Sequence, residues 1–217
     1  MSLDVSIVVL AKAPVPGRVK TRLCPPLTLD EAALLAAASL DDTLKAVAGV
    51  LGARPVLALE GSRTGLPDVR VIPQRGRGLD ERMAAAFDDV GGPALLIGAD
   101  TPQITGALLT AAATTLMAHG VDAVLGRALD GGWWIAGLRV PDARLFLGVP
   151  MSTSRTGRAQ ARRFHEHGLR TVELPLMRDV DRIADARAVA ASAPALAFSR
   201  RLRAISARSS HVEATII

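Results

Sequence analysis

The sequence predicts an α/β protein with three layers, in which helices cover both faces of a mostly parallel sheet. Short runs of consecutive apolar residues, such as 5–10 and 94–98, lack the alternation of a half-exposed strand, so both faces of these strands are expected to be buried. Segments with helical periodicity alternate with these runs along the chain, as parallel sheets require. The 217 residues, 49% of them hydrophobic, are enough for one substantial core.

A capping box predicts the first helix, after the strand at 5–10 and a loop that lasts to about residue 26. Thr28 and Glu31 have the spacing at which each side chain can accept a hydrogen bond from the other residue's backbone. Apolar residues follow at close to 3.6 spacing and are expected to face the core: Leu34, Ala37, Leu40, Leu44 and Val47. Gly49 and Gly52 end the helix.

The later elements continue the alternation. Further strands are predicted at 55–59, 69–72, 94–98, 123–126, 133–136 and 170–174, and further helices at 79–90, 104–119, 156–167 and 183–205. The tail at 206–217 has no clear pattern. Ligands of such sheets bind beyond the carboxyl ends of the strands, so the residues after Leu10, Gly98 and Gly126 are expected to share one rim.

Composition limits the class of partner. The net charge is +5 and most basic residues are arginines, yet aromatic residues make up 3% of the chain and tyrosine is absent. Because stacking platforms for bases are scarce, we expect no nucleic-acid partner, a basic nucleic-acid-binding or regulatory module being the alternative. No apolar run reaches ~18 residues and the N-terminus lacks a signal peptide's layout, so we expect a cytoplasmic protein without a membrane partner. Cys24 is alone and cannot form an internal disulfide.

The loop after the first strand is rich in cations. Two of the chain's three lysines lie in it, and its candidate ligands are Lys12, Gly17, Arg18, Lys20 and Arg22. Ammonium and guanidinium groups with nearby backbone amides suit a polyphosphate. The sequence matches neither the P-loop pattern nor G-x-G-x-x-G, and a solvated basic loop is the alternative.

Two acidic segments are candidate metal ligands. Asp100 follows the strand at 94–98 directly, and Asp179 and Asp181 alternate along an extended segment, so both can address one cation. Carboxylate oxygens suit Mg²⁺ or Mn²⁺. A turn or N-cap role explains Asp100 equally well, and capping of the helix near Ile183 explains Asp181.

The segment Asp130-Gly131-Gly132 precedes Trp133 and Trp134. The glycine pair would let the loop press against a ligand, and the Asp130 carboxylate could accept hydrogen bonds from a hydroxyl-rich group. The simpler interpretation is a hairpin-like turn that enters a strand, with both tryptophans in the core.

Hydroxyl groups and arginines gather at the predicted helix start near residue 156. Ser152 and Thr153 belong to this segment, which could bind an anion or simply cap the helix.

Taken in order, five motifs resemble one known group: K-A-P-x-P-G-x-x-K-T-R-L, L-I-G-A-D-T-P, D-G-G-W-W-I-A-G-L, M-S-T-S-R and R-D-V-D. They resemble bacterial transferases of the GT-A, or nucleotide-diphospho-sugar transferase, superfamily that are labelled selenodomain-associated or arsenosugar-biosynthesis-type glycosyltransferases. The chain is also similar to 2-phospholactate guanylyltransferases in its K-T-R-L loop, its aspartate-proline turn and its D-V-D. The resemblance implies one GT-A-like domain over 1–205, followed by the tail at 206–217.

The resemblance also implies roles for the candidate residues. Phosphates of the donor would meet Lys12, Gly17, Lys20, Thr21 and Arg22. The metal would be held by Asp100, Asp179 and Asp181. The acceptor side would include Asp130, as orienting group or base, with Gly131, Gly132, Ser152 and Thr153. Trp133 and Trp134 stand where the group usually has tyrosines, and Met151 stands where an aromatic residue often precedes Ser-Thr.

The expected partners are therefore a nucleoside-phosphate donor and a small-molecule acceptor, with Mg²⁺ or Mn²⁺ as cofactor. The favoured activity is glycosyl transfer from a nucleoside-diphosphate sugar, in which Lys20 and Arg22 stabilise charge on the leaving group and Lys20, Asp100 and Asp130 form the catalytic set. The alternative is nucleotidyl transfer from a nucleoside triphosphate to a phosphorylated small acid, such as 2-phospholactate or phosphoenolpyruvate, with release of pyrophosphate.

Overall fold

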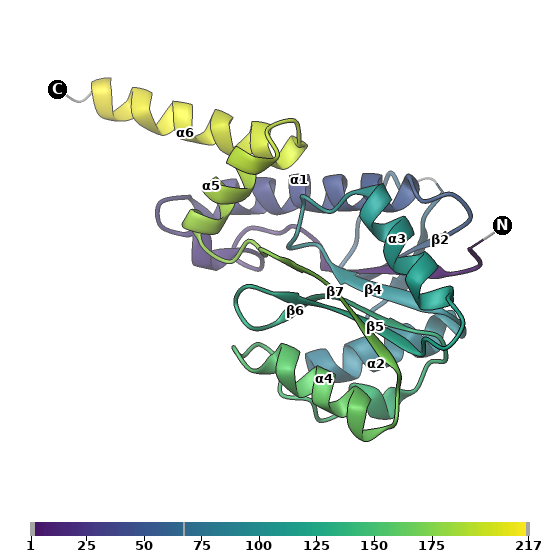
Figure 1. Ribbon diagram of the computed structural model, residues 1–217. Helices are drawn as coiled ribbons and strands as arrows, with labels where there is room; N and C mark the ends of the chain where they lie inside the picture. The colour runs from purple at the N-terminus through teal and green to yellow at the C-terminus, as the bar shows by residue number, and fades with distance from the viewer. Residues whose placement is uncertain (1–2, 67, 216–217) are drawn as a thin grey trace.

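The computed structural model describes residues 3–66 and 68–215. Within these residues, seven strands form one sheet in the order β3-β2-β1-β4-β6-β5-β7 (Figure 1). The strands are β1 (Ser6–Lys12), β2 (Arg54–Glu60), β3 (Arg70–Pro73), β4 (Ala94–Gly98), β5 (Ala123–Ala128), β6 (Trp133–Leu138) and β7 (Thr171–Met177). Strand β6 runs antiparallel to β4 and β5, and the other neighbouring strands of the described sheet are parallel. The prediction of a mostly parallel α/β sheet is confirmed.

Helices cover both faces of this sheet. They are α1 (Leu29–Ala48), α2 (Leu79–Val90), α3 (Gly106–Met117), α4 (Thr156–Glu166), α5 (Ile183–Ser192) and α6 (Ala197–Thr215), with short 3₁₀ turns η1 (Thr21–Leu23) and η2 (Ala143–Leu145). Helices α1 and α3 lie on one face, and α2 and α4 lie on the other (Figure 1). Within the described residues, none of the helices is both long enough and apolar enough to cross a bilayer.

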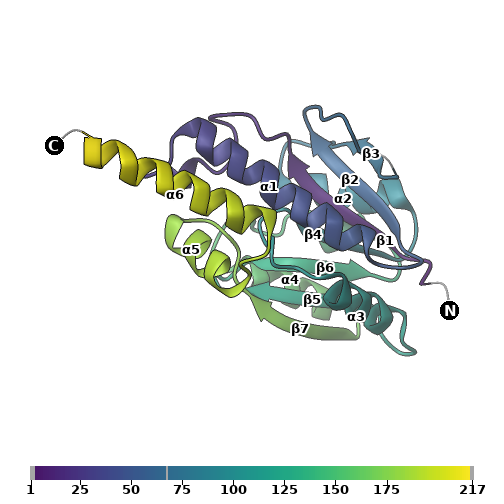
Figure 2. The ribbon, with the colours of Figure 1, turned by 90° about the horizontal axis from the view of Figure 1, so that it is seen from above.

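The C-terminal segment differs from its prediction. The single helix expected at 183–205 is two helices, because the chain turns at 193–196, where Pro194 follows the end of α5. Helix α6 then continues through the unassigned tail to Thr215 and lies alongside α1 (Figure 2). Residues 216 and 217, the end of that tail, lie outside the described residues.

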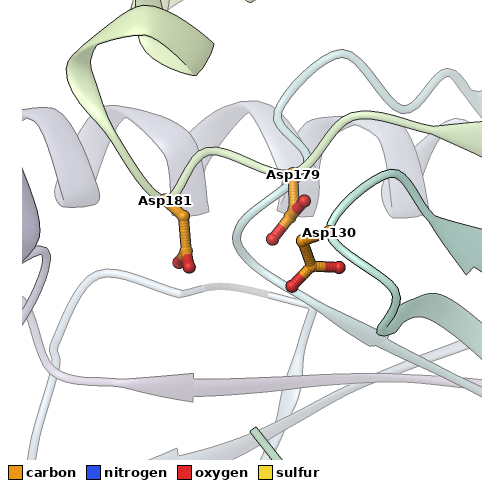
Figure 3. A group of neighbouring side chains, drawn as sticks. All are labelled: Asp130, Asp179 and Asp181. Carbon is orange, nitrogen blue, oxygen red and sulfur yellow. The ribbon is translucent and has the colours of Figure 1, made fainter. Parts of the chain in front are cut away.

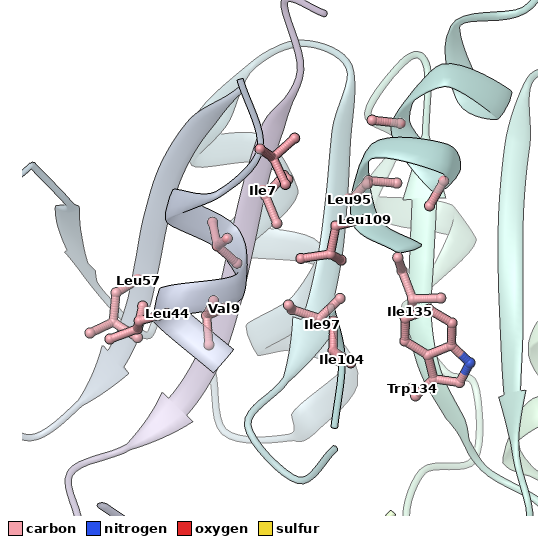
Figure 4. Close-up of a cluster of buried hydrophobic side chains, with 14 of the residues drawn as sticks. Ile7, Val9, Leu44, Leu57, Leu95, Ile97, Ile104, Leu109, Trp134 and Ile135 are labelled. Atoms are coloured by element: carbon pink, nitrogen blue, oxygen red, sulfur yellow. The ribbon is translucent and has the colours of Figure 1, made fainter. Parts of the chain in front are cut away.

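The packing of the core explains why the strands are continuous runs of apolar residues in the sequence. Along β1, Ile7 and Val9 pack toward α1 and α3, whereas Val8 packs on the opposite face (Figure 4). On that opposite face, the rings of Phe87 and Phe146 stack with their centroids 4.9 Å apart. Helices therefore cover both faces of the central strands. An alternation of apolar and polar residues along such a strand would bury its polar side chains.

Helix α1 begins at the predicted capping box. The Thr28 hydroxyl accepts from the Glu31 amide at 3.2 Å, and the Glu31 carboxylate accepts from the Thr28 amide at 3.0 Å. The predicted burial of Leu34 is wrong, because 44% of this residue is exposed, whereas Leu35 is fully buried. Helix α6 packs on α1, and Leu35 joins Phe198 and Leu202 of α6 in one buried apolar cluster.

Strand β7 continues past the predicted break at Pro175. This strand lies at the edge of the sheet and pairs with β5 on one side. A proline has no N–H to donate, and on an edge strand the outward-facing position needs none. The strand therefore reaches Met177, which brings the segment that follows it to the same rim as the ends of β1 and β4.

The start of α6 is held by a buried carboxylate of α1. Asp42 is 8% exposed, and its two oxygens accept from the Ala197 and Phe198 amides at 3.0 and 2.8 Å. We expect Asp42→Ala to lower the free energy of unfolding by about 2 kcal/mol, because two buried amides at a helix N-terminus lose a charged acceptor. Urea denaturation should show this loss, and Asp88→Ala, an exposed control on α2, should change the free energy by less than about 0.5 kcal/mol. Equal midpoints for the two variants would contradict the role of Asp42.

Candidate active site

The predicted rim forms at the carboxyl ends of β1, β4 and β5. Because these strands are parallel to one another, the loop after β1, the turn after β4 and the hairpin after β5 end at the same edge of the sheet (Figure 1). The segment after β7 joins them there, since the Val180 amide donates to the Asp100 carbonyl at 2.8 Å.

Lys20 ties three of these loops together. Its backbone is left-handed, with φ at +50°, and its side chain is 10% exposed. The ammonium group donates to the Val180 carbonyl and pairs with the Asp100 carboxylate. A buried ammonium with two oxygen partners is a fixed positive charge in the middle of the rim.

Other residues of the same loop extend this positive charge. Arg22 donates to the Asp181 carboxylate at 2.7 Å, and Thr21 lies between Lys20 and Arg22 in η1. Gly17 has φ at +76°, a conformation that favours glycine. Lys12 lies at the end of β1, and its ammonium group is 3.7 Å from the carboxylate of Glu60 at the end of β2.

A cavity of about 280 Å³, here called the basic cavity, lies beside this loop. Its charged lining consists of Lys12, Arg18, Lys20, Arg82 and Asp100, and its apolar lining includes Leu40 and Leu79. Lys12 and Arg82 share Glu60 as an ion-pair partner and Lys20 pairs with Asp100, so four cations meet two carboxylates here. The remaining excess of positive charge favours an anionic ligand.

The sequence interpretation did not include Gln74 and Arg82 of this cavity. The Gln74 amide donates to the Ala11 and Ala58 carbonyls at 2.8 and 3.0 Å and accepts from Arg82 at 3.2 Å. Gln74 directly follows β3, so the rule that ligands meet the carboxyl ends of strands could have found it. Arg82 lies inside α2, where no sequence signal marks it.

Three carboxylates gather on the other side of Lys20. Oxygens of Asp130, Asp179 and Asp181, here called the acidic cluster, lie within 4.8 Å of one another (Figure 3). The metal set expected from the sequence was Asp100, Asp179 and Asp181. The structure groups Asp130 with the last two and pairs Asp100 with Lys20.

Asp179 is the least solvated member of the acidic cluster. Burial first, and then the negative charges of Asp130, Asp181 and Asp100, together raise the pKa of its carboxyl group from the ordinary value of 3.8 to about 6. The half-buried carboxylate therefore lacks a compensating cation, which is the environment that a metal-binding carboxylate has before its metal binds.

The hairpin between β5 and β6 presents Asp130 to this cluster. The Asp130 carboxylate accepts from the Gly132 amide at 2.7 Å, and Gly131 has φ at +93°. A Cβ atom at Gly131 would overlap the Ser154 carbonyl, and the Gly157 amide donates to the Gly131 carbonyl at 2.8 Å. The glycine pair thus packs against the start of α4, and the turn interpretation explains its composition.

A second cavity of about 600 Å³, here called the wide cavity, opens beyond Asp100. Its apolar wall consists of Leu10, Leu79, Met83, Leu96, Trp133 and Met151. Residues with hydroxyl groups, Ser152, Thr153, Ser154 and Thr156, also line it. Its charged lining consists of Arg22, Asp100, Asp130 and Asp181, and the last two belong to the acidic cluster.

The two tryptophans have different environments. Trp134 is 3% exposed and donates from its indole nitrogen to the Pro175 carbonyl at 2.9 Å, as expected of a core residue. Trp133 is part of the wall of the wide cavity. Successive side chains of a strand point to opposite faces, and helices cover both faces of this sheet. Trp134 therefore packs in the core cluster on the α1 and α3 face, whereas the partly buried Trp133 packs against the cluster on the opposite face and also borders the wide cavity.

Similar structures share this fold. A protein of Desulfovibrio desulfuricans G20 described as a candidate nucleotide-diphospho-sugar transferase is 28% identical, with a TM-score of 0.83 over 95% of this chain and 96% of that one. A CMP:2-keto-3-deoxy-manno-octonic acid synthetase in complex with CTP is 11% identical, with a TM-score of 0.58 over 89% and 100%. Rv0371c of Mycobacterium tuberculosis H37Rv in complex with manganese is 21% identical, with a TM-score of 0.50 over 87% and 98%.

The comparison with family models gives a match over more than half of the chain, whereas no curated protein matches significantly. The matching model covers residues 33–153, which include the Asp100 turn, the Asp130 hairpin and the Ser152 segment. The chain belongs to the family DUF2064, described as "Uncharacterized protein conserved in bacteria".

Proposed function

We propose that the protein is a transferase that uses a nucleotide-activated donor, and that it transfers a sugar from a nucleoside diphosphate to a small acceptor. One observation carries this proposal: Asp100, the partner of Lys20, lines both the basic cavity and the wide cavity, and Asp130 and Asp181 of the acidic cluster line the wide cavity beside it. Two cavities that meet at charged groups are the arrangement that a two-substrate transfer needs. The related fold of the Desulfovibrio protein supports a nucleotide-diphospho-sugar donor.

The donor phosphates would bind at the loop after β1. Lys20 and Arg22 would face the diphosphate, and Lys12 and Arg18 would extend the positive lining of the basic cavity. A fixed ammonium that already lies at the rim stabilises the negative charge of the leaving diphosphate without reorganisation.

The acidic cluster fits a divalent cation. Its ligand atoms are carboxylate oxygens, as Mg²⁺ and Mn²⁺ prefer, and the half-buried Asp179 lies beside the negative charges of Asp130 and Asp181. We assign the cation to Asp179 and Asp181, with Asp130 and Asp100 facing the same space. A cation bound there would supply charge neutralisation for the diphosphate. The manganese complex of the fold-related Rv0371c agrees with this assignment.

Asp130 is the candidate base for the acceptor. It belongs to the lining of the wide cavity and to the acidic cluster, and its carboxylate accepts from the Gly132 amide. A carboxylate in this place can orient an acceptor hydroxyl group and take its proton.

Nucleotidyl transfer is the second candidate, and the basic cavity favours it. Its four cations suit a triphosphate, and a synthetase with CTP bound shares the fold. In that reaction a phosphorylated small acid, such as 2-phospholactate or phosphoenolpyruvate, would attack the α-phosphate and pyrophosphate would leave.

Product analysis separates the two reactions. The protein is incubated with Mg²⁺ or Mn²⁺ and with a panel of nucleoside-diphosphate sugars or nucleoside triphosphates. Glycosyl transfer predicts release of a nucleoside diphosphate from at least one sugar donor, with water as the slow acceptor, and no pyrophosphate from any triphosphate. Pyrophosphate release with a phosphorylated acid would replace the favoured reaction by the alternative. Release of neither product would contradict the transferase proposal itself.

Metal affinity should depend on pH through Asp179. The metal needs the ionised carboxylate, and the raised pKa of about 6 means that protons compete for it below this pH. We expect the apparent Mn²⁺ association constant, measured by electron paramagnetic resonance, to fall about tenfold per pH unit below pH 6 and to level off above pH 7. An unchanged affinity between pH 5 and pH 7 would contradict Asp179 as a ligand.

A further inference from the structure

The wide cavity offers little positive charge to a ligand. Arg22 is the one basic side chain in its described lining, and it already donates to Asp181 at 2.7 Å. Three carboxylates, Asp100, Asp130 and Asp181, belong to the same lining. A phosphorylated acceptor would therefore meet like charge at the end of the cavity where the transfer takes place.

The start of α4 does not compensate for this. Helix N-termini bind anions through free amide groups, but here the Gly157 amide donates to the Gly131 carbonyl at 2.8 Å and the Thr156 amide donates to the Thr153 carbonyl at 3.1 Å. The Arg155 amide donates to the Thr153 hydroxyl at 3.2 Å. These three amides already donate to acceptors inside the protein, so they are not free to bind a phosphate.

The rest of the wall favours an apolar ring. Trp133 supplies an aromatic surface, and Met83 and Met151 supply flexible thioether chains that adapt to the shape of a ligand. The Ser152 and Ser154 hydroxyls line the cavity and have no hydrogen-bond partner among the described residues, so they are available to hydroxyl groups of a ligand.

We propose that the wide cavity binds the acceptor, and that the acceptor is an uncharged molecule with an apolar ring and a hydroxyl group. This inference rests on the proposed function and names the substrate class of its second site. The acceptor's hydroxyl oxygen would form a bond to the anomeric carbon while the bond from that carbon to the diphosphate oxygen breaks. The leaving diphosphate keeps the electron pair, and the hydroxyl proton goes to the Asp130 carboxylate. A phosphorylated small acid does not fit this cavity.

Trp133 provides a local probe of this site. The chain has two tryptophans, and Trp134 is buried, so quenching that disappears in Trp133→Leu reports on the wide cavity. The probes are 4-nitrobenzyl alcohol and 4-nitrobenzyl phosphate, which share a quenching ring and differ in charge. Each is titrated into the full chain with Mn²⁺ and pyrophosphate present, so that the phosphate positions beside Lys20 are filled. The loss of fluorescence that is caused by absorption of light by the probes is measured in a parallel titration of free tryptophan amide and subtracted.

We expect saturable quenching by the alcohol, at least tenfold weaker binding of the phosphate, and loss of the saturable quenching in Trp133→Leu. Met151→Arg, which adds a cation to the wall, should shift the preference toward the phosphate by about tenfold, as one added charge pair at a partly exposed site allows. Equal or tighter binding of the phosphate by the unaltered protein overturns the proposal. Saturation by neither probe, or the same quenching in Trp133→Leu, overturns it as well.

The proposed function would fail differently. If pyrophosphate with Mn²⁺ gives no thermal stabilisation, the phosphate and metal assignments are wrong, whatever the aromatic probes do. If pyrophosphate stabilises the protein but the phosphate probe binds best, the donor site stands and only the acceptor class is wrong.

Discussion

Lys20→Ala is expected to lower kcat/KM for the nucleotide donor by about 10²–10³-fold, which is the usual cost of removing one preorganised positive donor from a transfer site. Lys20 is the buried cation of the rim and is already fixed by the Val180 carbonyl and the Asp100 carboxylate. Its loss leaves the leaving diphosphate with the more exposed Arg22. Steady-state kinetics with the donor found by product analysis measure the effect.

Two controls separate the chemical role of Lys20 from a structural one. Lys45→Ala removes an exposed lysine of α1 and should leave kcat/KM unchanged. Lys20→Arg keeps the positive charge but not the compact ammonium, so it should retain donor binding better than Lys20→Ala while the rate of transfer stays reduced. If Lys20→Ala keeps its thermal stability and more than a tenth of the kcat/KM, Lys20 is not the phosphate-stabilising group.

The contact between Lys20 and Asp100 shows what the sequence could predict about the site. The two residues are 80 positions apart, but each follows a buried strand of a parallel sheet, and the carboxyl ends of such strands share one edge. The topology therefore brings the two loops together before any side chain is considered. The same rule placed Asp130 at this edge.

The same rule could not predict from the sequence which carboxylates lie next to one another. The sequence interpretation grouped Asp100 with Asp179 and Asp181, whereas the described structure groups Asp130 with them. The difference depends on the direction of the Asp100 side chain, which is set by the ammonium of Lys20. Whether a carboxylate pairs with a cation or joins other carboxylates depends on differences of a few ångströms between the side chains. The spacing of residues along the chain gives no information about such distances.

The prediction of the fold from the sequence had a comparable limit at Leu34, which was expected to be buried. Strands and helices followed from apolar runs, periodicity and the capping box, because those signals are local. The burial of Leu35 in place of Leu34 depends on α6, whose contact with α1 joins segments more than 150 residues apart. A helix that buries two stripes does not show a single 3.6 periodicity, so the choice of face required the tertiary packing.

Asp179→Asn is expected to abolish metal binding and, at the same time, to make the metal-free protein more stable. Asp179 is half-buried beside Asp130 and Asp181, and burial together with their charges raises the pKa of its carboxyl group to about 6. In the unfolded chain the pKa is close to 3.8. Folding therefore favours the protonated carboxyl group, and the ionised group destabilises the native state. An asparagine amide of the same shape removes that repulsion but cannot serve as an anionic ligand.

The sign of this effect gives it a characteristic pH dependence. Below about pH 4 the carboxyl group is protonated in both the folded and the unfolded protein, so it causes no loss of stability. Between about pH 4 and pH 6 the unfolded chain ionises this group while the folded protein keeps its proton, so the loss of stability grows across this window and is complete above it. Because the group is partly exposed, we expect a gain of about 1 kcal/mol for Asp179→Asn at pH 7.5, or roughly 2–4 °C in Tm, and less than half of this gain near pH 4.5.

Thermal unfolding with and without Mn²⁺ tests both halves of this prediction. The unaltered protein should be stabilised by Mn²⁺ at pH 7.5, whereas Asp179→Asn should start from a higher Tm and show no shift with the metal. Asp88→Asn, an exposed aspartate on α2 far from the acidic cluster, should behave like the unaltered protein in both conditions. A metal shift that survives in Asp179→Asn would remove this residue from the site. A lower Tm without metal would mean that its carboxylate stabilises the fold, and the acidic cluster would then be a structural feature rather than a site kept at the expense of stability.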